Sequence, residues 1–340
     1  MAGRGRVLAM VAAGALLLTG CPADDQEPTG EPTDDGAAEP QPAEPVSVVI
    51  GTAVERDAAN VAFLMADEQG IYEECGLDAE VVHFAGGGAL MPALTAGEVD
   101  FGWVGTTTVV QAIEEGAPLK TIAEVNRSVA GWGLMVPADS PIQSVEDIQA
   151  GAQISFTSEG ALSHWFALYA AEQAGLSADD IVGVPLGGSV PAIRSAMETG
   201  DTDAAIVLLP WGQILEPDGF RWVMQFDEEL PEFSFTGLHT NEQTLEDRET
   251  AARVVGAYAR SVEWMTDNRE ETEAFIGDFY ELDEALASEV YDLVIPDYNP
   301  TGEMDVERMQ YLIDTVAEIP GFIEGTVTAE DVVDLVEPQC

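Results

Sequence analysis

Basic side chains are scarce in this chain. It has 12 lysine and arginine residues against 63 aspartate and glutamate residues, which gives a formal net charge of -51 at pH 7. Binding to nucleic acid or to an anionic lipid surface needs a basic face, so the composition excludes both. The acidic residues are interspersed with apolar ones, which favours a folded protein with a hydrated surface that stays soluble at high salt. An acidic face for a cationic partner is the alternative.

Motifs for catalysis are also lacking. The three histidines are scattered at His83, His164 and His239, and the chain has no HExxH, GxSxG or GxxxxGK[ST] motif. The single lysine, Lys120, follows a turn in GAPLKTI and is interpreted as a surface residue. The sequence therefore predicts no metal site, no cofactor and no enzyme activity.

Cysteine is also scarce. The chain has three cysteines, and the first of them, Cys21, is the most informative. Two arginines and the apolar run Val7–Leu18 precede Leu-Thr-Gly-Cys21. This order is typical of a secretory signal, residues 1–20, and the apolar run is too short to span a bilayer. The Leu-Thr-Gly-Cys sequence resembles a bacterial lipobox, which implies acyl chains on Cys21 that anchor the protein to the outer face of the cell membrane. An ordinary signal with an incidental cysteine is the alternative.

The predicted location outside the cytoplasm bears on the interpretation of two further features, an acidic segment and a pair of cysteines. Residues 21–45 are acidic, rich in proline and free of aromatics, which predicts an extended tether. Outside the cytoplasm Cys75 and Cys340 could form a disulfide. The sequence leaves a disulfide and two free thiols as open alternatives.

A repeated pattern predicts the fold class. Residues Ala93–Thr108 read as the end of a helix, a glycine stop, a buried strand and a small polar loop. Residues Ala196–Pro210 have the same layout, including a glycine and an aspartate three residues apart. Strands also alternate with helices before both segments. We therefore expect an α/β protein with two similar lobes, each a doubly wound and mostly parallel sheet.

The loops that follow the strands are the candidate ligand site, because ligands of open α/β sheets lie beyond the carboxyl ends of the strands. The candidate ligand-binding residues in these loops, and at the presumed crossing between lobes, are Thr52, Glu55, Asp57, Gly86, Gly87, Trp103, Thr106, Thr107, Arg127, Trp132, Thr157, Ser158, Gly160, Gly188, Ser189, Pro210 and Trp211.

Several of these candidates have a plain structural alternative. Thr157 and Ser158 precede a helix whose free N–H groups suit an anion, but they could simply cap that helix. Thr106 and Thr107 have the same two interpretations. The tryptophans could pack in a core or line an aromatic cleft.

The charged candidates bear on the ligand. Glu55, Asp57 and Glu159 are acidic loop residues that could be solvated surface. If they face a cleft, they favour a cationic or hydroxylated ligand over a simple anion. Arg127 is one of the few cations available as the counter-charge of an anion.

Several segments together carry a family resemblance. IYEECGLDAEVVHF, ALTAGEVDFGWVG, GAPLKTIAEV, SPIQSVEDIQAGAQIS and METGDTDAA resemble the periplasmic binding proteins of the sulfonate, nitrate, taurine and thiamine-precursor type, over about Val46–Trp211. The resemblance implies a type II fold, with lobe 1 at residues 46–130, lobe 2 at 131–232, and a helical part at 233–340 that completes lobe 1. It places the hinge near Asn126–Trp132 and Gln225–Phe235.

The resemblance also implies a function. These proteins capture a small solute outside the cytoplasm and deliver it, as monomers, to the permease and ATPase of an ABC importer. Within the group, a binder of thiamine precursors, pyrimidines or aromatic solutes is an alternative to a sulfonate or nitrate binder. A related biosynthetic enzyme and a sensory or adhesive lipoprotein are the rival classes.

Overall fold

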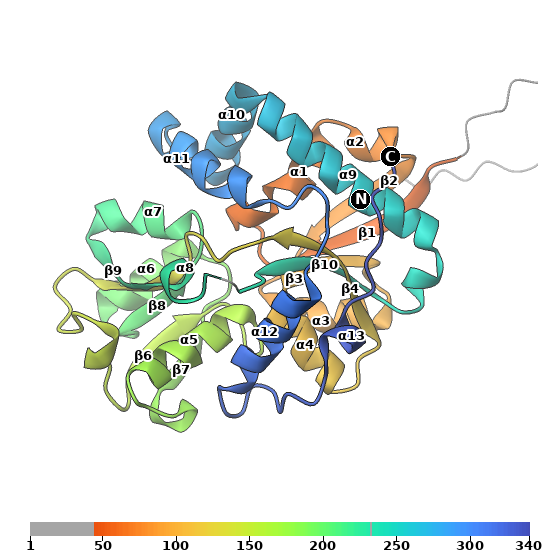
Figure 1. The fold of residues 1–340 in the computed structure, drawn as a ribbon. Helices are drawn as coiled ribbons and strands as arrows, with labels where there is room; N and C mark the ends of the chain where they lie inside the picture. The colour runs from red at the N-terminus through yellow and green to blue at the C-terminus, as the bar shows by residue number, and fades with distance from the viewer. Residues whose placement is uncertain (1–43, 232) are drawn as a thin grey trace, which may run out of the picture. The chain divides into compact units, whose positions relative to one another are not determined.

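The computed structural model describes residues 44–231 and 233–340. The predicted signal peptide, the predicted lipidation site Cys21 and nearly all of the predicted tether lie outside these residues. Within them the strands form two five-stranded sheets. Figure 1 shows the first sheet among the red, yellow and cyan elements and the second among the green ones.

The first sheet has the strand order β2-β1-β3-β10-β4. Strand β1 is parallel to β2 and β3, whereas β10 is antiparallel to β3 and β4. The strands are β1 (Val46–Thr52), β2 (Leu77–His83), β3 (Phe101–Gly105), β4 (Leu119–Asn126) and β10 (Thr236–Asn241).

The second sheet has the equivalent order β7-β6-β8-β5-β9. Strand β6 is parallel to β7 and β8, and β5 is the antiparallel strand between β8 and β9. The strands are β5 (Gly133–Pro137), β6 (Gln153–Phe156), β7 (Val182–Pro185), β8 (Ala204–Val207) and β9 (Phe220–Gln225). The matching topologies confirm the predicted α/β class with two similar, mostly parallel lobes.

The repeated sequence segment has the same structure in both lobes. Gly97 and Gly200 end their helices in the left-handed region, at φ 72° and 76°. Asp100 then accepts a hydrogen bond from the Val49 backbone N–H at 2.7 Å, and Asp203 accepts one from the Gln153 backbone N–H at 2.8 Å. Each aspartate thus fixes the start of one strand against its parallel neighbour.

The antiparallel strands were not predicted from the sequence. Strand β10 reads TGLHTN and lies where we expected helices, yet all six of its residues are buried. Its polar side chains are paired: the His239 ring is hydrogen bonded to Thr121 Oγ1 at 2.9 Å and to the Val104 carbonyl oxygen at 3.2 Å. Burial lowers the pKa of His239 to about 4, so this ring is neutral at pH 7.

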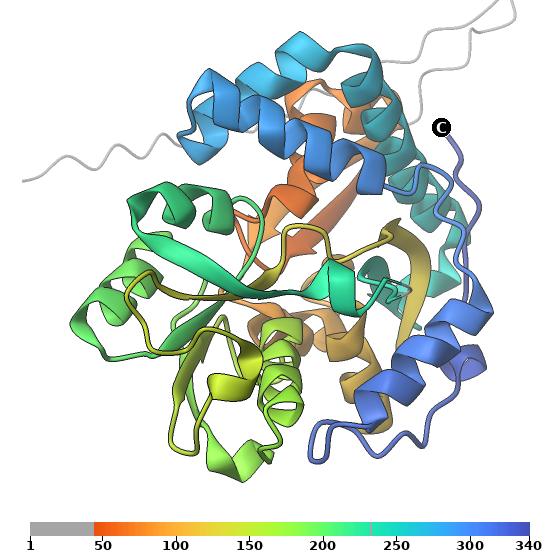
Figure 2. The same ribbon diagram turned by 60° about the vertical axis from the view of Figure 1, so that its left-hand side comes forward.

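Helices pack on both sheets and, after β10, against the first lobe. Helices α9 and α1 pack together, and α12 contacts α4 while α13 contacts β4. Figures 1 and 2 show this C-terminal helical part, in cyan and blue, around the red-to-yellow elements. The α-helices are α1 (Val61–Glu68), α2 (Ile71–Glu74), α3 (Gly87–Ala96), α4 (Thr106–Glu114), α5 (Leu162–Gln173), α6 (Val190–Thr199), α7 (Trp211–Leu215), α8 (Phe226–Glu229), α9 (Arg248–Asp267), α10 (Arg269–Tyr280), α11 (Glu284–Val294), α12 (Val306–Ala317) and α13 (Ala329–Val332).

Short 3₁₀ helices complete the secondary structure. They are η1 (Ala58–Asn60), η2 (Val145–Asp147), η3 (Ala178–Asp180), η4 (Glu216–Asp218), η5 (Thr244–Glu246) and η6 (Ile295–Asp297). Among the described helices, none is both long and apolar enough to cross a membrane.

The chain crosses between the lobes twice, and the two crossings lie side by side. The first runs from β4 to β5 and the second from β9 to β10 (Figure 2). The Phe226 backbone N–H donates to the Trp132 carbonyl oxygen at 3.0 Å, which joins them.

A disulfide links Cys75, just after α2, to Cys340. Their Cα atoms are 5.2 Å apart, and the sequence separation is 265 residues. Of the two alternatives for these cysteines, the structure therefore has the disulfide, which ties the C-terminal segment to lobe 1.

Candidate functional site

A small cavity lies between the two lobes, at the carboxyl ends of their parallel strands. Its volume is about 30 Å³. Lobe 1 and β10 contribute Ala53, Val54, Asp57, Gly87, Trp103, Val104, Gly105, Thr108, Phe235 and Thr236, and lobe 2 with its crossover contributes Trp132, Thr157, Ala161, Leu162 and Ser163. We call this space the interlobe cavity.

Polar atoms without partners mark this cavity. Trp132 Nε1 and Thr108 Oγ1 line it from opposite lobes, and neither has a hydrogen-bond partner among the described residues. The two side chains are only 5% and 3% exposed. Buried polar atoms are usually paired, so these two are available to hydrogen bond with a molecule bound in the shared cavity.

Three helices begin at the cavity without a side-chain cap. The N-cap residues of α3, α4 and α5 are Gly86, Gly105 and Ala161, and none makes a side-chain capping hydrogen bond. The interpretation of Thr157 as the cap of α5 is therefore wrong: its Oγ1 is hydrogen bonded to Ser163 Oγ at 2.7 Å. The first turns add partial positive charge to the site, although the Thr106 N–H of α4 already donates to the Phe235 carbonyl oxygen at 3.1 Å.

Asp57 is the acidic residue of the cavity. It is 2% exposed, and its carboxylate caps η1 by accepting from the Ala59 backbone N–H at 3.0 Å. Burial raises its pKa to about 8, with the Ala59 hydrogen bond acting in the opposite direction. With a pKa of about 8, the Asp57 carboxyl is mostly neutral at pH 7 and able to donate a hydrogen bond.

The other two acidic candidates do not reach this cavity. Glu55 is exposed and lines a neighbouring groove. Glu159 lies on the opposite side, where its carboxylate is 3.5 Å from His164 Nε2 and 67% exposed. The acids therefore do not make the cavity itself anionic.

Two tryptophans tie the walls of the site together. Trp103 lines the cavity and donates through Nε1 to Thr236 Oγ1 at 3.1 Å and to Asn126 Oδ1 at 3.3 Å. Trp211, from lobe 2, donates through Nε1 to the Arg56 carbonyl oxygen of lobe 1 at 2.9 Å. Both rings are fully buried, so each has a packing role as well as a place at the site.

Three glycines lie at close contacts between the two lobes. A Cβ atom on Gly105 would lie 2.7 Å from Leu162 Cβ, and one on Gly188 would lie 2.6 Å from Val54 Cγ1. Gly86 is packed in the same way against Ser158. Contacts this short exclude a side chain, so these glycines allow the close approach of the two lobes.

A larger groove of about 730 Å³ lies on one side of the cavity. We call it the outer groove. Two arginines line it, one from each lobe: Arg56 Nη2 is 3.0 Å from Glu281 Oε1, and Arg194 is paired with Asp218. Its volume is in the range of small-molecule pockets.

The predicted site residues divide into four groups. Asp57, Gly87, Trp103, Trp132 and Thr157 line the interlobe cavity, and Glu55, Gly188, Ser189, Pro210 and Trp211 line the outer groove. Thr52, Gly86, Thr106, Thr107 and Ser158 are not among the residues that line either space. Gly160 lines a groove on the other side, and Arg127 lies elsewhere.

Thr52 has a partner of its own. Its Oγ1 is hydrogen bonded to His83 Nδ1 at 2.6 Å across the β1–β2 pair. Sequence reasoning did not single out Thr108, Arg194, Phe235 or Thr236. The missed β10 explains Thr236, whereas Thr108 directly follows two predicted threonines and could have been found.

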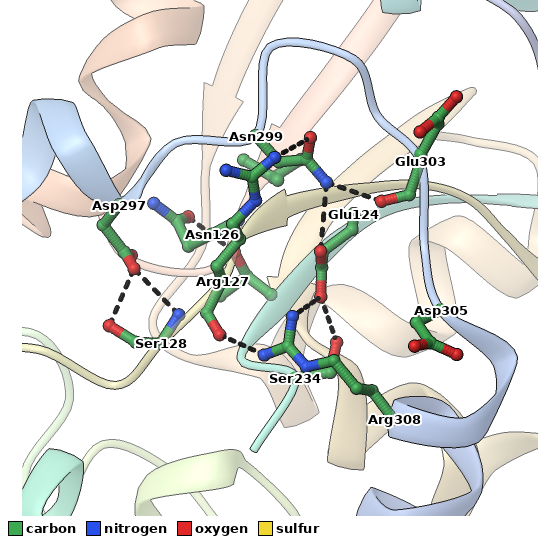
Figure 3. Close-up of polar contacts among 12 residues, drawn as sticks. Glu124, Asn126, Arg127, Ser128, Ser234, Asp297, Asn299, Glu303, Asp305 and Arg308 are labelled. Carbon is green, nitrogen blue, oxygen red and sulfur yellow. Dashed lines mark hydrogen bonds and ion pairs between the residues drawn. The ribbon is translucent and has the colours of Figure 1, made fainter. Parts of the chain in front are cut away.

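Arg127 belongs to a second polar cluster, beside the interlobe crossings (Figure 3). Its side chain donates to Asn299 Oδ1 at 2.9 Å. The structure thus does not bring it to the interlobe cavity as the counter-charge of an anion.

At the centre of this cluster is Glu124, which is 2% exposed. Its carboxylate accepts from Ser234 Oγ at 2.9 Å, Asn299 Nδ2 at 3.0 Å and Arg308 Nη1 at 3.3 Å. Ser234 lies on the second crossing, and Arg308 also donates to the Arg127 carbonyl oxygen on the first, at 2.6 Å. Glu124 and Arg308 therefore hold both crossings to the C-terminal part of lobe 1 (Figure 3).

Asp297 adds a further contact to the first crossing. Its Oδ1 accepts from the Ser128 backbone N–H at 2.8 Å and from Ser128 Oγ at 2.7 Å. Burial raises the pKa of Asp297 to about 6 in spite of these hydrogen bonds. We call Glu124, Arg127, Ser128, Ser234, Asp297, Asn299 and Arg308 the hinge cluster.

Two α/β lobes, two adjacent crossings and a cavity at the strand ends of both lobes define the periplasmic-binding-protein class of fold. The family model described as NMT1/THI5 like matches residues 58–272, and the chain belongs to this family.

Solved structures share the fold. The periplasmic aliphatic sulphonate binding protein SsuA of Escherichia coli is similar with a TM-score of 0.69 and 20% identity, over 87% of this chain and 94% of that one. The periplasmic nitrate-binding protein NrtA of Synechocystis PCC 6803 is similar with a TM-score of 0.64 and 13% identity, over 85% and 86%. A Brucella abortus protein that is named as a binding protein is 26% identical over 225 residues, which are 65% of this chain and 68% of the relative.

Proposed function

We propose that this protein captures a small organic solute outside the cytoplasm, between its two lobes, and delivers it to an ABC importer. The observation that carries the proposal is the interlobe cavity, where three helices without a side-chain cap begin and where Trp132 Nε1 and Thr108 Oγ1 have no partner among the described residues. Every one of these groups can donate a hydrogen bond. The cavity volume of about 30 Å³ has room for about one water molecule, so the lobes must separate to admit a solute. The family and the named functions of its structural relatives support a solute-binding role.

The remaining parts of the proposal concern location and partners. A lipid on Cys21 would hold the protein at the outer face of the membrane, and the acidic tether would give it reach. Its partners would be the permease and ATPase of the importer, with the protein acting as a monomer.

Because the predicted donors converge on the solute, we expect it to present hydrogen-bond acceptors. A thermal-shift panel of ethanesulfonate, taurine, nitrate, an aminopyrimidine, an aliphatic amine and an aromatic acid tests the proposal. A specific solute at a hundred times its Kd should add about 2.7 kcal/mol to the free energy of unfolding. If no solute changes the melting temperature, the proposed function loses its support.

Gly188 supplies a variant that separates binding from folding. A valine there would collide with Val54, whose Cγ1 would lie 2.6 Å from the new Cβ, and should keep the lobes apart. We expect Gly188→Val to retain its melting temperature without solute but to lose the solute-induced shift. Adding Val54→Ala should restore part of that shift, because it removes the colliding methyl groups.

The enzyme alternative has less support from the site. The lysine that a cofactor-dependent relative would need is Lys120, which donates to the Asp331 carbonyl oxygen at 2.5 Å and lies 3.9 Å from Glu242. Neither it nor a histidine is among the residues that line the interlobe cavity. A sensory or adhesive role without a transporter would be distinguished by whether permease and ATPase genes lie beside this one.

A further inference from the structure

Asp57 carries the only ionisable side chain among the described residues that line the interlobe cavity. Its surroundings are donors: Trp132 Nε1 and Thr108 Oγ1 are unpaired, and the uncapped starts of three helices face the same space. A charged carboxylate would find no cation there. A neutral carboxyl can instead donate its own proton to the same bound group as the other donors.

The burial of Asp57 depends on contact between the lobes. On one side of it, the Arg56 carbonyl oxygen accepts from Trp211 Nε1 of lobe 2 at 2.9 Å. On the other side, the Ala58 backbone N–H donates to the Leu209 carbonyl oxygen of lobe 2, also at 2.9 Å. Separation of the lobes breaks both hydrogen bonds and lets water reach the carboxyl group.

The ionisable groups around Asp57 do not neutralise it. Tyr280 of α10 donates to the Asp57 carbonyl oxygen at 3.1 Å, and Tyr298 donates to the Ala59 carbonyl oxygen at 3.0 Å. Burial raises the pKa of both phenols well above the ordinary value, so they stay neutral. Of the neighbouring loop residues, Arg56 is paired with Glu281, and Glu55 lines the outer groove.

We propose that Asp57 is a specificity-determining residue: when the lobes close over a solute, its carboxyl is buried as the neutral acid and donates its O–H to an acceptor group of that solute. This inference rests on the proposed function. It implies that closure takes up a proton, and that a sulfonate or a sulfone binds whereas a quaternary ammonium ion of similar size does not.

The sign of the pH dependence follows from the two states. An exposed aspartate has a pKa of about 3.9, and in the closed structure burial raises the pKa of Asp57 to about 8. Below the lower value the carboxyl is neutral in both states, so affinity does not vary. Between the two values affinity falls about tenfold per pH unit, because closure must first protonate the group.

The first experiment is solute-independent. In the structure, a Cβ atom on Gly188 would be 3.7 Å from Val54 Cβ, which suits a disulfide between the lobes. In the full chain with Val54→Cys and Gly188→Cys, oxidised, the ¹³C carboxyl resonance of Asp57 should titrate near pH 8. Titration near pH 4 would overturn the inference.

The second experiment measures Kd for ethanesulfonate, dimethyl sulfone and tetramethylammonium from pH 5 to pH 8. The first two probes do not titrate in this range, so a fall of about tenfold per pH unit would come from the protein. Asp57→Asn keeps a donor and a cap but cannot ionise, and it should abolish the pH dependence. Asp247→Asn is the matched control, since Asp247 caps α9 through the Thr250 N–H at 3.1 Å, away from the cavity residues.

The outcomes separate this inference from the proposed function. If Asp57 titrates near pH 8 in the cross-linked chain while no probe binds at any pH, the proposed solute function fails and the protonated closed state stands. If a sulfonate or sulfone binds equally well across the range, or tetramethylammonium binds and does so more tightly as pH rises, the role of Asp57 is refuted.

Discussion

The interlobe cavity and the hinge cluster are both buried polar regions, but they differ in how their polar atoms are paired. In the hinge cluster the Glu124 carboxylate accepts three hydrogen bonds, and Ser128 and Ser234 each donate to a carboxylate. In the cavity, Trp132 Nε1 and Thr108 Oγ1 have no partner within the described chain. Polar groups that are fully hydrogen bonded within the protein stabilise one arrangement of the chain, whereas polar groups without a partner remain able to bind another molecule.

Asn126 lies between the two regions. Its Oδ1 accepts from Thr236 Oγ1 at 2.6 Å and from Trp103 Nε1 of the cavity wall at 3.3 Å. The first interlobe crossing is therefore connected to the cavity through this side chain.

The largest effect should follow from removal of the central acid of the hinge cluster. Glu124→Ala leaves Arg308, Asn299 and Ser234 without their shared acceptor, and we expect a loss of about 3–5 kcal/mol in the free energy of unfolding. Urea denaturation measures it. Asp292→Ala is the control, because its ion pair with Arg269 is exposed and contributes about 1 kcal/mol or less. Equal losses in the two variants would show that the cluster is not a saturated buried network.

Asp297 should give the next largest effect, and one that depends on pH. Its pKa of about 6 in the folded state lies above the unfolded value of about 3.9, so its contribution to stability is fully present below pH 4 and is lost as pH rises through 6. The shift corresponds to about 3 kcal/mol.

Asp297→Asn removes this titration. The difference in unfolding free energy between the wild type and the variant should therefore change by about 3 kcal/mol from pH 4 to pH 7, in favour of the variant at the higher pH. A constant difference across this range would contradict the raised pKa.

The unpaired atoms of the cavity should behave in the opposite way. Thr108→Val removes a polar atom that has no partner among the described residues, so we expect the free energy of unfolding to change by less than about 1 kcal/mol. Trp132→Phe also removes ring atoms packed against Phe166 and Phe235, so it should cost about 1–3 kcal/mol. Solute affinity should fall about tenfold in each, or about 1.4 kcal/mol.

Thr236→Val is the matched control for this pair, because Thr236 lines the same cavity with a fully paired hydroxyl. Thr236→Val should lower the free energy of unfolding, which denaturation measures. Thr108→Val should instead lower solute affinity, which calorimetry measures, and Trp132→Phe should lower both. If Thr108→Val is as destabilised as Thr236→Val, the distinction between paired and unpaired groups does not hold.

The sequence allowed the architecture to be predicted where a pattern is repeated. Gly97 and Asp100 recur as Gly200 and Asp203, and they make the same helix end and strand contact in each lobe. Strand β10 escaped prediction because its polar residues suggest a loop, and they are buried only through partners such as Thr121 that are distant in the sequence.

The site was predictable in location but not in chemistry. Trp132 and Asp57 were expected at the cleft from their place after strands, and both line the cavity. The raised pKa of Asp57 was not, because it comes from burial in the folded chain. A sequence pattern gives the type of a side chain, but it does not give the extent to which the fold removes that side chain from water.

The smallest effect should come from Arg127, which the sequence suggested as the counter-charge of an anionic ligand. In the structure its side chain is exposed and donates to Asn299, and it is absent from the linings of the interlobe cavity and the outer groove. Arg127→Ala should therefore change solute affinity less than twofold and stability by less than about 1 kcal/mol, since surface contacts of this kind contribute little. Calorimetric titration of ethanesulfonate at low salt, where any long-range attraction would be strongest, is the stringent measurement. A tenfold loss would mean that the hinge cluster takes part in binding, and the separation of the two regions would have to be given up.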